Sequence, residues 1–131
     1  MQANAQAGDT SLGTWMLNAA KSTFSAGGQL TSGTIKFEAA GAGIKHIVDV
    51  DGTVNDHFAF TANYDGKDTP INSLLGDMVA LTRINANTTN AVYKKDGKVT
   101  VTQTWVISED GKTLTITATG AVNNVTVWNK Q

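Results

Sequence analysis

Asp-Gly dipeptides divide most of this chain into short segments. Asp-Gly is a strong signal for a two-residue hairpin turn, because Asp and Gly tolerate the positive φ that such turns require. Three of the four copies continue as Asp-Gly-Lys, and two further turn candidates contain Gly or Asn. The six candidate turns are 41–43, 51–52, 65–66, 96–97, 110–111 and 123–124. Turns about every 10 to 15 residues predict a series of short strands joined by hairpins.

The segments between the turns have the composition of β-strands. The chain contains nineteen threonines together with many valines and isoleucines, which favour a pleated, half-buried surface. Nine segments and one short piece are therefore expected to be strands: Gly13–Asn18, Ser32–Ala39, Ile44–Asp51, Val54–Tyr64, Lys67–Ile71 (the short piece), Met78–Asn85, Asn90–Lys95, Lys98–Ser108, Thr113–Val122 and Val125–Lys130.

Closure into a barrel is the economical arrangement for so many strands in 131 residues. Hairpin connections and a single proline indicate an antiparallel meander, and closure removes its exposed edges. We therefore predict an all-β fold, an antiparallel up-and-down β-barrel of eight to ten strands, with an open sandwich as the alternative. Two stretches are expected to be irregular, Ala19–Thr31 and Ile71–Asp77, the second with a helical turn capped by Asn72 or Ser73.

Hairpin register predicts which side chains face inward. A two-residue loop at Asp110-Gly111 places Ile107 opposite Leu114 and Trp105 opposite Ile116. An Asn123-Asn124 loop would place Val125 and Val127 on the same inner face. By alternation the rest of this face is expected to hold Ile35, Phe37, Ile44, His46, Val48, Val50, Phe58, Phe60, Ala62, Tyr64, Val79, Leu81, Arg83, Ala91, Tyr93, Val99, Val101, Gln103 and Ala118.

Four polar side chains on this apolar face need hydrogen-bond partners, water or a ligand: His46, Arg83, Tyr93 and Gln103. Arg83 suits a ligand carboxylate, but it also suits stacking on Trp15 at a barrel end or a place at the rim. Gln103 also fits a core amide whose hydrogen bonds are satisfied within the protein.

The two histidines depend on the turn at Asp51-Gly52. A two-residue loop would place His46 opposite His57, where two imidazoles could hold a metal. A three-residue loop pairs Val50 with Val54 and His46 with Phe58, and turns His57 outward. The second register matches apolar with apolar residues and is favoured, so no metal site is predicted.

Composition excludes several classes of function. A net charge of −1 and an isoelectric point near 6.0 give no basic surface for nucleic acid, and no apolar run is long enough to cross a membrane. The absence of cysteine excludes disulfides, thiolate zinc sites and a cysteine nucleophile. Motifs for serine hydrolysis, phosphate binding and zinc proteolysis are also missing, so no catalytic residue and no cofactor is predicted.

The first ten residues differ from the rest. They are small and polar, and Ala3-Asn4-Ala5 and Ala5-Gln6-Ala7 resemble the end of a secretory signal. We expect residues 1–10 to be a disordered segment, a possible signal remnant, and residues 11–131 to form a single barrel domain. Export to a bacterial periplasm or to the exterior is the corresponding expectation for localisation.

The opening of the first strand resembles a known superfamily. Gly13-Thr14-Trp15 is similar to the Gly-x-Trp signature of the lipocalins and calycins, whose tryptophan fills one end of the barrel. The longer opening, residues 13–24, resembles small lipocalin-like proteins of bacteria. The chain lacks the helix pair and the C-terminal Arg-x-Tyr of fatty-acid-binding relatives, and of the later tryptophans of avidin-like barrels only Trp105 has an evident match. The resemblance implies a cavity and leaves its occupant open.

Binding of a small apolar or amphipathic molecule inside the barrel is the function predicted first, with the protein a monomer or homodimer. The first alternative is a cofactor-free cyclase or isomerase that uses His46 and Tyr93 as an acid–base pair. The second is a solid barrel that acts through outward Trp128, Val106 and Ile47. The expected ligand-binding residues are Phe37, His46, Phe58, Phe60, Arg83, Tyr93, Gln103, Trp105 and Ile116.

Overall fold

A computed structural model describes residues 11–24, 29–53 and 55–131. Nearly all of the ordered backbone in these ranges is β-strand, as the alternating, threonine-rich segments predict. The elements are β1 (Gly13–Leu17), the 3-10 turn η1 (Ala19–Lys21), β2 (Thr23–Phe24), β3 (Leu30–Ala40), β4 (Gly43–Gly52), β5 (Asp56–Asn63), β6 (Thr69–Ser73), β7 (Gly76–Asn85), β8 (Thr88–Lys95), β9 (Lys98–Ile107), β10 (Thr113–Gly120) and β11 (Asn124–Lys130).

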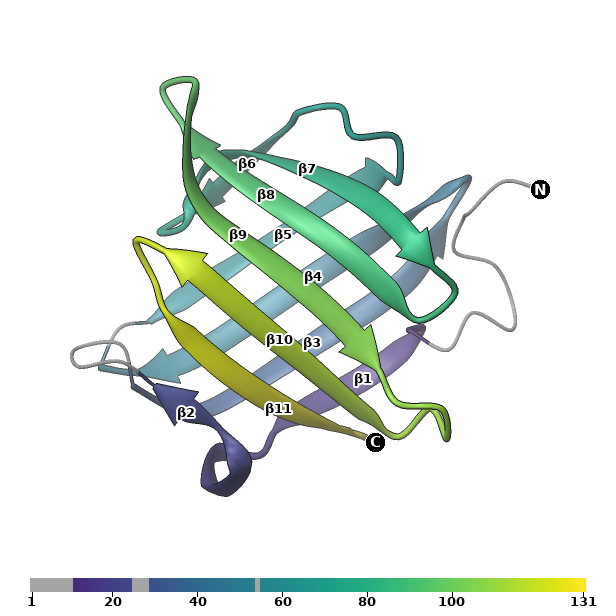
Figure 1. Cartoon of the computed structure of the whole chain (residues 1–131), viewed down its shortest axis with the longest axis vertical. Helices are drawn as coiled ribbons and strands as arrows, with labels where there is room; N and C mark the ends of the chain where they lie inside the picture. Colours follow the sequence, from purple (N-terminus) through teal and green to yellow (C-terminus); the bar gives the residue numbers. More distant parts are fainter. Residues whose placement is uncertain (1–10, 25–28, 54) are drawn as a thin grey trace.

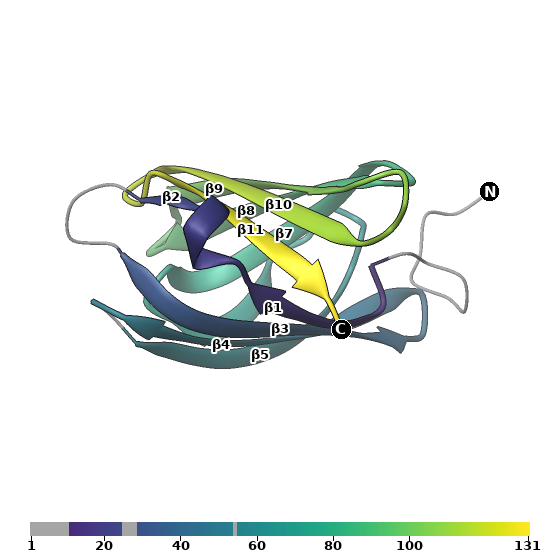
Figure 2. The same cartoon turned by 90° about the horizontal axis from the view of Figure 1, so that it is seen from below.

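The strands form one antiparallel sheet that curls into a nearly closed barrel (Figure 1). Its order is β5-β4-β3-β1-β11-β10-β9-β8-β7-β6, with β2 paired to β11 at the side. β1 joins the two halves of the chain, because Trp15 lies opposite Ile35 of β3 and opposite Lys130 of β11. Figure 2 shows the resulting two layers, β1 with β3, β4 and β5 in one and β7 to β11 in the other. The predicted up-and-down barrel is confirmed, and this architecture fits a lipocalin-like fold in general.

The remaining seam lies between β5 and β6, the two ends of the strand order. Side chains cross it: the Ser73 hydroxyl donates to Asp56 Oδ2 at 2.7 Å, and the Leu74 amide donates to the same oxygen at 3.2 Å. Asp56 therefore ties the first strand of the seam to the turn that follows the second.

Hairpin turns gather at the two ends of the barrel. We call one end the mouth, which contains the end of β4, the start of β5 and the turns 74–75, 96–97 and 119–123. The other is the closed end, which contains the turns 41–42, 86–87 and 109–112. The mouth is on the left in Figure 1 and the closed end on the right. The turn at Asp96-Gly97 has positive φ at both residues, 52° and 80°, as the Asp-Gly pattern predicts.

The register predicted for the β9–β10 hairpin is confirmed. Ile107 lies opposite Leu114 and Trp105 opposite Ile116, and all four side chains are buried. Val99 is different: a bulge after Tyr93 pairs Val99 with Lys94 and leaves it 59% exposed, so its predicted inward position is wrong. The bulge adds one residue to β9 relative to β8, so side chains before the bulge point to the opposite face from the one that alternation predicts.

The predicted register of the last strand is also wrong. Residues 119–123 separate the paired residues Ala118 and Asn124, a longer connection than the expected Asn123-Asn124 turn. The longer turn inverts β11, so that Thr126 and Trp128 face inward at 4% and 2% exposure while Val125 is 37% exposed. The expectation of an outward Trp128 is corrected by the same finding.

The Asn123 side chain closes this longer turn. It accepts a hydrogen bond from the Gly120 amide at 3.3 Å and donates to the Gly120 carbonyl at 2.9 Å. Gly120 itself has φ of 114°, which disfavours other residues.

The β4–β5 hairpin keeps the predicted faces with a different partner for His46. Val54 lies outside the described residues; beyond it Val50 pairs with Asp56, which places His46 opposite Phe60 instead of Phe58. A shift of two residues preserves the side on which each side chain points. His57 is exposed as predicted, and the two histidines are on opposite faces of the sheet.

The helical turn predicted between Asn72 and Leu75 is replaced by a hairpin turn. Ser73 pairs with Gly76, and the Leu75 amide donates to the Ser73 hydroxyl at 3.0 Å, so the serine caps a turn between strands. In the described ranges no helix is long and apolar enough to span a membrane.

Candidate functional site: the cavity at the mouth

A cavity of ≈330 Å³ occupies the interior next to the mouth. Its volume falls in the range of small-molecule sites, about 300–1,000 Å³. It reaches the surface beside the turns, where the exposed residues Leu74 and Ala121 line it. The lining consists of Leu30, Ile35, His46, Val48, Val50, Asp56, Phe58, Leu74, Leu75, Tyr93, Gln103, Ile116, Ala118, Ala121, Val122, Asn124, Thr126 and Trp128.

Small side chains on one wall explain why space is left. Ala118 and Ala121 come from β10 and the turn after it, and Thr126 faces them from β11. A barrel of this size has an interior that large side chains fill, so residues this small leave a void unless larger ones reach across. The strands opposite supply aliphatic and aromatic walls, and the cavity lies between them.

The closed end has large side chains and almost no space. Trp15 is fully buried there, and its indole Nε1 donates to the Ser11 carbonyl at 2.9 Å. A gap of ≈10 Å³ at this end, bordered by Ser11, Phe37 and Leu114, is too small for a ligand. Tryptophan in the first strand thus fills this end, as the Gly-x-Trp resemblance implies.

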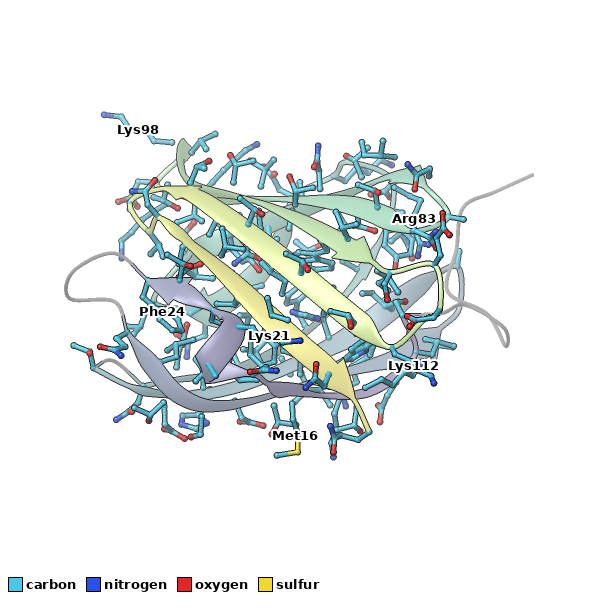
Figure 3. The ribbon with its side chains drawn as sticks, turned by 60° about the horizontal axis from the view of Figure 1, so that its bottom comes forward. Met16, Lys21, Phe24, Arg83, Lys98 and Lys112 are labelled. Carbon is cyan, nitrogen blue, oxygen red and sulfur yellow. The ribbon has the colours of Figure 1, made fainter. Side chains whose placement is uncertain are left out.

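Arg83 lies at the closed end, away from the cavity. Its guanidinium stacks over the Tyr64 ring at 4.2 Å, and Nη1 donates to the Ala86 carbonyl at 3.2 Å. Figure 3 shows Arg83 at the opposite end from Phe24 and Lys98. The stacking expected on Trp15 is made on Tyr64, and the arginine is not available to a molecule in the cavity.

The structure places five of the nine expected ligand-binding residues on the cavity wall: His46, Phe58, Tyr93, Gln103 and Ile116. The other four lie elsewhere: Phe37, Trp105 and Arg83 border the small gap at the closed end, and Phe60 is buried in the core.

An aromatic cluster separates the cavity from the closed end. The His46 ring stacks on Trp105 with 4.8 Å between centroids and an interplanar angle of 19°. Phe37 lies 4.7 Å and Phe60 5.1 Å from the same imidazole. His46 is therefore the polar member of a packed aromatic partition, and one side of it faces the cavity.

His46 is neutral and has no hydrogen-bond partner within the described residues. It is 2% exposed, and its Nδ1 is a buried atom without a partner. Burial lowers the pKa of this imidazole to about 3, because the charged form loses its hydration. At neutral pH the ring brings one donor and one acceptor to the interior and no charge.

Tyr93 and Gln103 contribute polar atoms to the same cavity from the other layer. Burial, and then the negative charge of Asp56, raise the pKa of the Tyr93 hydroxyl far above its ordinary value, so it stays protonated. No hydrogen bond joins this hydroxyl to another described residue. Gln103 Oε1 accepts from Trp105 Nε1 at 2.8 Å, which satisfies part of the amide within the protein.

Sequence reasoning missed Asp56, Thr126 and Trp128. Asp56 begins β5 two residues before the inward Phe58, so the same alternation that places Phe58 inside was the available signal for it. Trp128 and Thr126 were missed because of the last-strand register, and Trp128 Nε1 donates to Thr126 Oγ1 at 2.9 Å. The size of Trp128 was the available signal, because an indole on the outer face would expose a large apolar area.

On the outer face His57 contacts two carboxylates. Its Nδ1 is 2.9 Å from Asp49 Oδ1 and its Nε2 3.1 Å from Asp51 Oδ1. These two hydrogen bonds raise the pKa of His57, which is solvent-exposed. A search of the described ranges finds no group of three or more such side chains arranged to hold a metal ion.

Comparison with known proteins finds no matching family model, no matching curated protein and no matching solved structure.

Proposed function

We propose that this protein binds a small apolar or amphipathic molecule in the cavity at the mouth. The observation that carries the proposal is a void of ≈330 Å³ with largely apolar walls, which the polar side chains of His46, Tyr93 and Gln103 also line. A few polar groups on an apolar wall are what a small-molecule site requires. Burial of the ligand would supply about 25 cal/mol for each Å² of apolar surface removed from water.

The titration behaviour of the two polar residues favours binding over catalysis. A general acid or base is most effective when its pKa lies near the working pH. Burial moves the pKa of His46 down to about 3 and that of Tyr93 upward, so both move away from neutrality. The pair can offer fixed hydrogen bonds to a ligand, and proton transfer near pH 7 is not supported.

We further propose that the chain is related to the lipocalin-like barrels of the calycin superfamily. Support comes from Gly13-Thr14-Trp15, whose tryptophan is buried at the closed end. The small, polar residues 1–10 are the reason to propose export to a bacterial periplasm or the exterior.

Titration with neutral apolar probes tests the binding proposal. We expect saturable binding of octanol by calorimetry, with a change in tryptophan emission because Trp128 lines the cavity. Ala118→Leu puts three more carbons into the void and should weaken binding by about ten-fold or more, at little cost in stability.

Ala91→Leu is the matched control. Ala91 is fully buried on β8 and does not line the cavity, so the same change overpacks the core and should cost about 1–3 kcal/mol while leaving octanol affinity unchanged in the folded protein. If octanol does not bind, or binds Ala118→Leu as tightly as the parent, the proposal is wrong.

A further inference from the structure

The formal charge on the cavity lining is negative. Of the described residues that line it, Asp56 is the only one with a formal charge at neutral pH, and none is lysine or arginine. His46 is neutral in its buried position, and Arg83 is held at the closed end. A ligand carboxylate would therefore find no cation here and would lie near another carboxylate, which is unfavourable in a partly buried site.

Asp56 is held with its carboxylate at the mouth. Its two hydrogen bonds, from the Ser73 hydroxyl and the Leu74 amide, both use Oδ2. No hydrogen bond to Oδ1 from another described residue accompanies them. The side chain is half-buried and lines the cavity, so this oxygen is placed to accept from a ligand.

A second polar group lines the same cavity, from the other layer of the barrel. The Tyr93 side chain is 1% exposed, lines the cavity, and is near enough to Asp56 to feel its charge. Its hydroxyl oxygen can accept a hydrogen bond, and no described residue supplies one. Two acceptors on the lining of one cavity and a net negative charge match a donor that carries positive charge.

Resting on the proposed function, we infer that the cavity takes an amine-bearing amphiphile, whose ammonium is bound by Asp56 and the Tyr93 hydroxyl at the mouth. The apolar body of the ligand packs against Phe58, Ile116 and Trp128. A charge-assisted hydrogen bond between an ammonium and a carboxylate is about twice as strong as a neutral one, so the head group determines which amphiphile is preferred.

Three probes with eight carbon atoms each test this inference: octylamine, octanol and octanoate. At pH 7 we expect octylamine to bind about ten-fold tighter than octanol and octanoate to bind weakest, because hydrogen bonds to charged groups are worth about 1.5–3 kcal/mol. Asp56→Asn keeps an acceptor for Ser73 and Leu74 but removes the charge. It should bring octylamine to within about two-fold of octanol.

Ser73→Ala is the control for loss of a hydrogen bond across the seam between β5 and β6. It removes one hydrogen bond to Asp56 without changing the charge in the cavity, so the preference for octylamine should remain. Ala118→Leu should weaken all three probes, which separates binding in the cavity from attraction of the amine to carboxylates on the surface.

The outcomes distinguish the inference from the proposed function. Octanoate binding as tightly as octylamine, or an unchanged amine preference in Asp56→Asn, would overturn the inference and leave the binding function standing provided octanol binds. If none of the three probes binds, both are wrong.

Discussion

The two ends of the barrel interior are built from the same sheet and differ in what fills them. At the closed end, Trp15, Phe37 and Leu114 are buried with a residual gap of ≈10 Å³. At the mouth, Ala118 and Thr126 occupy comparable inward positions, and ≈330 Å³ remains. The closed end makes the contacts that stabilise the fold, and the mouth leaves apolar surface for another molecule. Close packing and empty volume are thus separated along the axis of one barrel.

Matched truncations on one strand test this division and should give the largest effect. Leu114 and Ile116 both lie on β10 and lose the same number of carbons on substitution by alanine. Leu114→Ala empties a packed position and should cost about 2–5 kcal/mol of unfolding free energy, whereas Ile116→Ala widens an existing void and should cost about 2 kcal/mol or less. Urea denaturation measures both. Equal losses would contradict the division.

The pH dependence of stability tests the aromatic partition that contains His46. The expected change in unfolding free energy is intermediate in size. The folded pKa of His46 is about 3 and the unfolded value is 6.5, so between these values the unfolded chain binds more protons. His46 therefore contributes stability above pH 6.5 that is lost as pH falls toward 3, with a limiting slope of about 1.4 kcal/mol per pH unit.

His46→Phe is the matched variant for this experiment. Phenylalanine keeps an aromatic ring against Trp105 and cannot be protonated, so subtraction of its pH profile removes the contribution of the carboxylates. We expect the parent to lose stability relative to the variant below pH 6.5, measured by urea denaturation at pH 4.5 to 7.5. Parallel profiles would mean that His46 is hydrated in the folded protein.

Tryptophan emission should show the smallest effect. Trp128 lines the cavity and Trp15 is at the closed end. Trp128→Phe should remove most of the emission change that octanol produces, and Trp15→Phe should retain it. A ligand response that depends on Trp15 would place the binding site at the wrong end. Both variants keep an aromatic ring, and thermal melts check that they fold.

Much of the fold follows from local sequence signals. Asp-Gly turns and alternating apolar residues are short-range features, so the β9–β10 pairing of Trp105 with Ile116 could be predicted residue by residue. The register failed at Val99 and at β11, where a bulge and a longer turn each change the parity of the strand. The Asn123 side chain that closes the longer turn makes its contacts only once the backbone is formed.

The candidate site was predictable only in part, because a cavity is set by what is absent from it. Alternation places His46, Tyr93 and Gln103 inside but does not say which end of the barrel each one reaches. Alternation places Arg83 inside as well, but its guanidinium stacks on Tyr64 at the closed end and does not line the cavity. Alternation with Phe58 also places Asp56 inside, and its position at the mouth follows from the pairing of β5 with β4.

The turn at residues 119–123 has a consequence for how this chain can change over evolution. Its residues are mostly exposed, so substitutions there should be tolerated, apart from Gly120 and Asn123, which close the turn. Its length is a different matter. Deletion or insertion of one residue would rotate the final strand by half a turn, sending Trp128 into water and Val127 into the cavity, whereas an indel of two would keep the faces. Among relatives of this protein, length variation at the rim should therefore come in even steps.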